Sequence, residues 1–224
     1  MKDRDINLLK FSVILFLFLN SKNILLLLNK IIKVNGIIEI SLSFIISLVA
    51  YLLYKKDLKK ELIKFKKKKK EYIKLTFKLF SVLLAVKFIT AVIIVILSEI
   101  LNISLVISEN QEIINDILKV NPLYIFIAAV IIAPFLEEVI FRLGVRKVIK
   151  NNYLFIIISG LIFGLLHVFP TTVGLTKALI DGINYVTIGL LFSYFYVKHK
   201  NIYIIILLHG VNNLFGVLAS LFVL

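Results

Sequence analysis

Long apolar runs, interrupted only by short polar segments, constrain the fold of this chain more than any other feature of its sequence. Hydrophobic residues make up 60% of its 224 residues, about 134 side chains, and only 18% of the residues are charged. Soluble domains are ~45–50% apolar and ~25% charged, whereas one membrane-spanning helix uses roughly 20 apolar residues. The sequence therefore predicts an all-α fold, a polytopic transmembrane helical bundle, and excludes a soluble enzyme with one anchor.

The apolar runs are numerous enough for about seven spans. The first follows a short polar start and has no small-residue cleavage site, so we expect it to stay as a span rather than to be removed as a signal peptide. The expected spans cover residues 11–28, 37–54, 75–97, a segment starting at 122, 153–169, 177–197 and 202–224. Without a linker or an internal repeat, we expect one transmembrane domain over residues 1–224, with N-terminal spans and a basic loop in 1–121 and the candidate site in 122–224.

The positive charge is concentrated in one loop between spans. The chain has 27 basic and 13 acidic residues, and residues 55–74 alone hold 11 lysines and three acids. Such a loop is typical of the cytoplasmic side of a membrane, where it also meets anionic lipid headgroups. We therefore expect a cytoplasmic N-terminus and no nucleic-acid partner, although a patch for another acidic partner is an alternative. Leu58, Leu62 and Phe65 recur at helical spacing, which predicts that part of the loop lies flat on the membrane surface.

The fourth span contains charges that insertion into lipid disfavours. Glu137, Glu138 and Arg142 lie inside an apolar helix, where each charge costs ~2.5–3.5 kcal/mol. Glu138 and Arg142 are four residues apart and can form an ion pair, whereas Glu137 points about 100° away from Glu138. Pro134 frees a carbonyl in the preceding turn, as happens where membrane helices bend around a cavity. The ion pair explains Glu138 but not Glu137.

Two of the three histidines also lie inside apolar spans. Glu137 and His167 stand 14 and 15 residues from the turn between the fourth and fifth spans, so both lie about 21 Å from it. His209 lies nine residues beyond Lys200, roughly 13 Å from its own turn, and Asn213 follows one helical turn later. We therefore expect Glu137, His167, His209 and Asn213 to meet in a polar catalytic cavity in the cytoplasmic half of the bundle.

These residue types suit amide hydrolysis by an activated water. A carboxylate beside an imidazole can take a proton from water, and a second imidazole with a carboxamide can stabilise an oxyanion. The absence of Cys excludes a thiol nucleophile, and no Ser lies in a nucleophile elbow near the histidines. Glu137, His167 and His209 also match the donor set of a catalytic zinc site. The usual His-Glu-x-x-His motif is absent, so we prefer no cofactor and keep zinc as an alternative.

Three motifs in this order resemble those of a known family. They are Glu137-Glu138-x-x-x-Arg142, Phe163-x-x-x-His167 and His209-x-x-x-Asn213, each inside an apolar span. They resemble the motifs of the CPBP family, the type II CAAX prenyl endopeptidases and bacteriocin-processing proteases. Flanking residues add to the resemblance, which covers about Leu123–Gly216: Ala133, Pro134, Phe141, the run from Gly189 to Asn201, Ile205, Leu207 and Leu208.

The resemblance implies an intramembrane endopeptidase of a prokaryotic cell membrane with a CPBP-like core in 122–224. In that family pattern Glu137 with His167 activates water, His209 with Asn213 stabilises the tetrahedral oxyanion, and Glu138 and Arg142 support the site. The implied substrate is a membrane-embedded or lipidated peptide, either prenylated and CAAX-type or bacteriocin-type.

Two other functions remain open at this stage. The same fold could serve as a non-catalytic bacteriocin-immunity or scaffold protein that uses the polar cluster for binding. A proton-coupled transporter would need ionisable residues along a pathway, and the spans offer only Lys87 and Asp181 besides the cluster. Asp181 lies four residues after Lys177 and can pair with it, which weighs against the transporter.

Overall fold

We analysed a computed structural model that describes residues 3–103, 109–169 and 174–223. Within these residues the regular elements are all helical, which confirms the predicted all-α class. In order they are α1 (Asp3–Leu19), α2 (Ser21–Asn29), α3 (Gly36–Lys67), α4 (Lys69–Ile100), α5 (Glu109–Val120), α6 (Pro122–Ile125), the π-helix η1 (Phe126–Ile132), α7 (Ala133–Glu138), the π-helix η2 (Val139–Gly144), α8 (Val145–Val148), α9 (Asn152–Leu166), α10 (Leu175–His199) and α11 (Ile202–Val223).

All seven predicted apolar runs are helical, but not all are long enough to cross a bilayer. Five helices have the required length and composition, namely α3, α4, the continuous helix Pro122–Val148, α10 and α11. A sixth span results if α1 and α2, which meet at a 47° bend, are counted together. The remaining run, which forms α9, has only 15 residues, or about 22 Å of helix, less than the ~30 Å of a hydrocarbon core. The count of about seven is thus one above the upper figure because α9 ends at Leu166.

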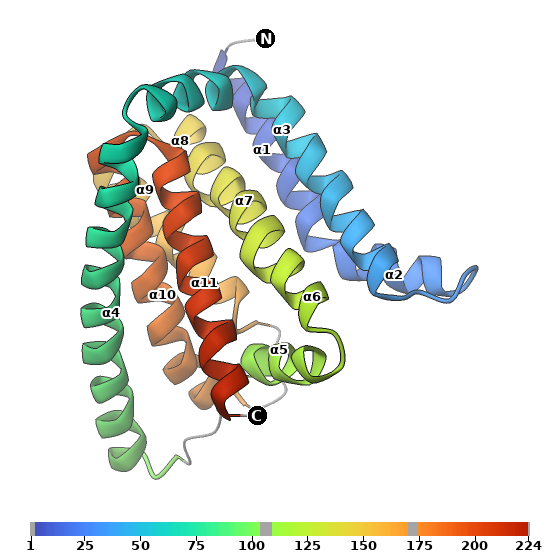
Figure 1. Ribbon diagram of the computed structural model, residues 1–224, viewed down its shortest axis with the longest axis vertical. Helices are drawn as coiled ribbons and strands as arrows, with labels where there is room; N and C mark the ends of the chain where they lie inside the picture. The colour runs from blue at the N-terminus through green and yellow to red at the C-terminus, as the bar shows by residue number, and fades with distance from the viewer. Residues whose placement is uncertain (1–2, 104–108, 170–173, 224) are drawn as a thin grey trace.

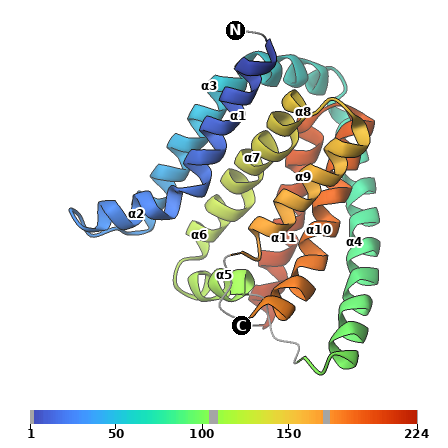
Figure 2. The same ribbon diagram turned by 180° about the vertical axis from the view of Figure 1, so that it is seen from behind.

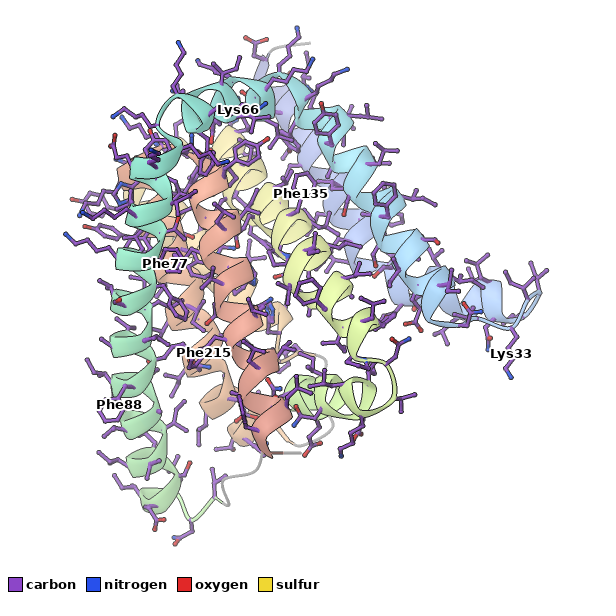
Figure 3. All side chains as sticks on the ribbon, viewed as in Figure 1. Lys33, Lys66, Phe77, Phe88, Phe135 and Phe215 are labelled. Atoms are coloured by element: carbon purple, nitrogen blue, oxygen red, sulfur yellow. The ribbon has the colours of Figure 1, made fainter. Side chains whose placement is uncertain are left out.

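The N-terminal half of the chain packs on both sides of the C-terminal half. Figures 1 and 2 show α1 and α3 along one side of the helix Pro122–Val148, and α4 along the opposite side of the bundle, next to α10 and α11. Phe77 and Phe88 point outward from α4, as Figure 3 shows, and they are 57% and 71% exposed. Such apolar side chains on the outer face are those that lipid would cover.

The lysine-rich segment joins α3 to α4 at one end of the bundle, where α8 meets α9 and α10 meets α11 (Figure 1). Asp57 pairs with Lys147 of α8, and the Glu61 carboxylate accepts hydrogen bonds from Tyr196 and from the backbone N–H of Ile202. Leu58 is fully buried in the core. The apolar side of this segment therefore packs onto the end of the bundle, and its position at the membrane surface stays a prediction.

The helix Pro122–Val148 contains two π-helical segments, one on each side of α7. Pro134 lacks an N–H and its ring crowds the preceding turn, and η1 ends two residues before it. The second segment, η2, begins directly after Glu138. Widened turns of this kind are often found at functional sites, and here they flank the residues that carry the two carboxylates.

Helices α9 and α10 approach each other closely through glycines. A Cβ at Gly164 would lie 2.5 Å from the Val186 backbone, and one at Gly160 would lie 2.7 Å from the backbone N of Leu190. Only residues without a side chain permit this distance between two helices, as in other membrane bundles. The contact holds α9, and with it His167, against α10.

We expect Gly164→Ala to lower the thermal unfolding midpoint, because its methyl group would push backbone away from backbone. Overpacking of this kind typically costs about 1–3 kcal/mol. The measurement is thermal unfolding of the purified protein in detergent. Gly216→Ala is the matched control, because a Cβ at Gly216 meets no atom within 4 Å. Equal midpoints for the two variants would contradict the close contact.

Candidate active site

The structure brings Glu137, His167 and His209 together from three helices. Glu137 lies in α7, His167 directly follows α9, and His209 lies in α11. Glu137 Oε2 is 3.7 Å from His167 Nε2 and 3.9 Å from His209 Nε2. The three side chains are 12%, 20% and 5% exposed. The depth count along the helices thus predicted the meeting of these residues.

Hydrogen bonds at Nδ1 fix how both imidazoles present their other nitrogen. His167 Nδ1 lies 2.7 Å from the Phe163 carbonyl oxygen, and His209 Nδ1 lies 2.8 Å from Glu138 Oε1. A carbonyl and a carboxylate can only accept, so each Nδ1 carries the hydrogen. When the rings are neutral, both Nε2 atoms therefore present lone pairs toward the Glu137 carboxylate. Three acceptors that face one another suit a species with hydrogens to donate, such as water.

Glu138 connects the second histidine to a buried arginine. Glu138 Oε2 lies 3.2 Å from Arg142 Nε, and both side chains are 0% exposed, so the predicted ion pair is present. The guanidinium also donates to the Gly189 carbonyl oxygen at 3.4 Å and lies 4.4 Å from the centre of the Phe163 ring. Sequence reasoning missed the bond from Glu138 to His209. It places His209 between two carboxylates, with one at each ring nitrogen.

Asn213 lies one turn beyond His209, and its side-chain amide already forms two hydrogen bonds within the protein. Its Nδ2 donates to the Ala129 carbonyl oxygen at 2.8 Å, and its Oδ1 accepts from Asn212 Nδ2 at 3.1 Å. The second N–H of Asn213 can donate to an oxyanion. His209 Nε2 can do so only when its ring is doubly protonated, because Glu138 occupies Nδ1. The predicted oxyanion pair therefore requires an imidazolium at His209.

Aromatic rings complete the surroundings of the two histidines. Tyr185 of α10 stacks on His167, with ring centres 4.9 Å apart and an angle of 21°, and Phe192 lies 5.3 Å from His209. Sequence reasoning did not single out Tyr185, and no motif marks it. Phe163 is the first residue of the second motif, and its carbonyl lies one helical turn before His167.

A cavity of about 430 Å³ opens next to these residues. Its walls include Glu137, His167 and His209 and extend past Asn213 to Tyr124 of α6. Helices α5 and α6 lie at the end of the bundle opposite the lysine-rich turn (Figure 1). The cavity therefore extends from Glu137 toward the end of the bundle that carries α5 and α6. Counting residues along the helices predicted which side chains meet. It could not predict where the helices diverge and leave a cavity.

Glu137, His167 and His209 are the residues that would hold a zinc ion if one were bound. Zinc needs Glu and His donors within ~2.0–2.2 Å. Within residues 3–103, 109–169 and 174–223, no three His, Asp or Glu side chains lie where they could hold a metal ion together. Whether the protein uses zinc therefore stays a prediction for metal removal to test.

A family model matches the C-terminal part of the chain, and curated proteins are similar to parts of it. Residues 119–215 match the family model described as Type II CAAX prenyl endopeptidase Rce1-like. The chain is 30% identical to the UPF0177 protein YvdC of Lactococcus lactis over 139 residues, 61% of this chain and 50% of that protein. It is 33% identical to the "Putative membrane peptidase YdiL" of Bacillus subtilis over 117 residues, 51% of this chain and 44% of that protein.

This chain thus spans about half the length of the curated relatives that it matches. No solved structure matches it. The family match contains all three motifs on which the resemblance was based, from Glu137 to Asn213. Residues 119–215 of this chain are thus similar to the type II CAAX prenyl endopeptidase Rce1-like family, in agreement with the predicted resemblance to CPBP proteins.

Proposed function

We propose that this protein is an intramembrane endopeptidase that hydrolyses peptide bonds with a water molecule activated by Glu137. One observation carries the proposal. The buried Glu137 Oε2 accepts no hydrogen bond from any described group, yet it faces Nε2 of His167 and of His209. A desolvated carboxylate in a membrane bundle is costly, and a water that donates to Glu137 and to an imidazole would stabilise it.

The reaction follows from these positions. A water donates one hydrogen bond to Glu137 and one to His167, which directs an oxygen lone pair at the substrate carbonyl. As the water oxygen bonds to that carbon, Glu137 takes a proton and the carbonyl oxygen becomes an oxyanion. Asn213 and protonated His209 donate to the oxyanion, and Glu138 stabilises the imidazolium. The C–N bond then breaks, and the proton on Glu137 passes to the leaving amine.

The proposed substrate is a membrane-embedded or lipidated peptide, prenylated and CAAX-type or bacteriocin-type. A cavity of about 430 Å³ among membrane helices fits a short extended segment and not a folded domain. The test compares membrane proteomes of cells that carry wild-type protein or Glu137→Ala. We expect uncleaved substrate to accumulate with the variant. If no protein accumulates and an immunity phenotype survives in Glu137→Ala, the function is that of a non-catalytic immunity or scaffold protein.

We further propose a prokaryotic cell membrane as the location, with the N-terminus and the lysine-rich loop in the cytoplasm. The clustering of residues 55–74 at one end of the bundle supports this orientation, and anionic headgroups are the proposed partner of those lysines that do not pair within the bundle. Lys66 lies at that end in Figure 3, and Glu112 belongs to α5 at the other end.

The orientation can be tested cleanly because the chain has no Cys. We expect a membrane-impermeant maleimide to label Glu112→Cys but not Lys66→Cys in intact cells, since only the former is predicted to face outward. Both variants should react after the membrane is permeabilised, which controls for exposure. Labelling of Lys66→Cys in intact cells would contradict the orientation.

Metal independence is a separate prediction. We expect the activity of the purified protein to be unchanged after prolonged dialysis against a strong chelator, because the proposed mechanism uses only side chains and water. Elemental analysis of the dialysed sample provides the control for metal removal. Loss of activity that is restored by added zinc, and not by magnesium, would contradict the mechanism.

A further inference from the structure

Lys87 is a cation deep in a predicted membrane helix and takes no part in the proposed chemistry. It lies in α4, 13 residues beyond Lys74 at the basic end, or about 20 Å into the bundle. Ionisable residues at such depth are costly and usually mark a functional site. Its side chain is partly buried and lines the same cavity as Glu137 and His209.

Lys87 forms a hydrogen bond with a side-chain amide, whereas other buried charged residues form ion pairs. Its Nζ donates to Asn212 Oδ1 at 3.1 Å, and no ion pair involves it in the part of the chain that the structure describes. By contrast, Asp181 pairs with Lys177 at 3.0 Å, as the sequence predicted, and Arg142 pairs with Glu138. An ammonium carries three donors, so at least two of them remain after the bond to Asn212.

The amide partner also connects Lys87 to the reactive residues. Asn212 donates to Asn213 Oδ1, and Asn213 donates to the Ala129 carbonyl oxygen. Lys87, Asn212 and Asn213 therefore form a hydrogen-bonded row across α4, α11 and η1, along the wall of the cavity. A group bound at Lys87 would share the cavity with a peptide bond held at Glu137.

We propose that Lys87 and Asn212 form a subsite for a carboxylate of the peptide substrate, and so determine specificity. The proposal rests on the proposed function, because it places one end of the same substrate. A carboxylate would supply the counter-charge that the described residues do not give Lys87, and would accept hydrogen bonds from Nζ. Its source is either the free C-terminus of the peptide or an Asp or Glu side chain near the cleaved bond.

Binding of defined probes tests the subsite without cleavage. The host is Glu137→Gln, which removes the proposed base, in detergent or nanodiscs. The probes are acetyl-Leu-Leu-Leu with a free C-terminal carboxylate, the same peptide as its C-terminal amide, and acetyl-Leu-Asp-Leu amide. We expect the Kd of a carboxylate probe to be roughly tenfold lower than that of the neutral amide, as is typical of a charge-assisted hydrogen bond. The first and third probes distinguish the two sources.

Two further substitutions attribute the preference to Lys87. Lys87→Met should bind all three probes with equal Kd. Asn212→Asp should also abolish the preference, because the new carboxylate would pair with Lys87 and exclude the carboxylate of the probe. This substitution preserves side-chain size, so it provides the test if Lys87→Met fails to fold. Equal binding of acid and amide probes in the Glu137→Gln host, or no binding of either, would overturn the subsite. Cleavage of a natural substrate is not needed for any of these outcomes, so a failure of the proposed function would be seen separately.

Discussion

Replacing Glu137 with glutamine is expected to lower the rate of peptide-bond hydrolysis by about 10²- to 10⁴-fold, the usual contribution of a general base. Gln has the size of Glu but cannot accept the proton of the attacking water. Because His209 is protonated in the proposed mechanism, only Nε2 of His167 would remain to accept a proton near the water, with the Nδ1 hydrogen of His167 directed at Phe163. The measurement is kcat with the purified protein and a substrate identified by the proteomic comparison.

The same substitution on an exposed acid is the matched control. Glu71 pairs with Lys68 between α3 and α4, and its side chain is 61% exposed. Glu71→Gln should therefore keep the wild-type rate, while both variants insert and accumulate normally. A Glu137→Gln protein that hydrolyses the substrate at the wild-type rate would show that another group activates the water.

The meeting of the candidate catalytic residues could be predicted because the number of residues along a helix gives the distance of a side chain from the end of the bundle. Counting from one turn placed Glu137 and His167 at the same level, and Glu137 Oε2 lies 3.7 Å from His167 Nε2. The four-residue spacing of Glu138 and Arg142 likewise predicted the buried pair. Both inferences depend on the fixed rise and period of an α-helix, so they required no knowledge of how the helices pack.

Contacts that depend on helix rotation and packing could not be predicted in this way. Nothing in the sequence indicates that the second oxygen of Glu138 faces His209, or that Tyr185 stacks on His167. The burial of Leu58 was also missed, because an apolar stripe on a basic helix fits a membrane surface as well as a protein core. The extent of the cavity was also missed. Residues of α5 and α6 line it, and nothing in the spacing of the sequence indicates how these helices pack.

Removing the guanidinium at Arg142 is expected to cost about 3–5 kcal/mol of stability, because the Glu138 carboxylate would stay buried without its cation. Both side chains are 0% exposed, so water cannot replace the lost partner. We expect Arg142→Leu to accumulate poorly in membranes and to unfold at a lower temperature in detergent. Lys147→Leu is the matched control: its pair with Asp57 is partly exposed, and such pairs contribute only ~0–1 kcal/mol.

The double variant Glu138→Leu/Arg142→Leu separates the fold from the chemistry. Apolar replacement of both members of a buried pair is often close to neutral, so we expect accumulation to recover. Activity should not recover, because His209 Nδ1 would lose the carboxylate that orients the ring. Recovery of stability together with activity would show that the pair only supports the bundle. Recovery of stability alone would place Glu138 in the mechanism, as the group that orients His209.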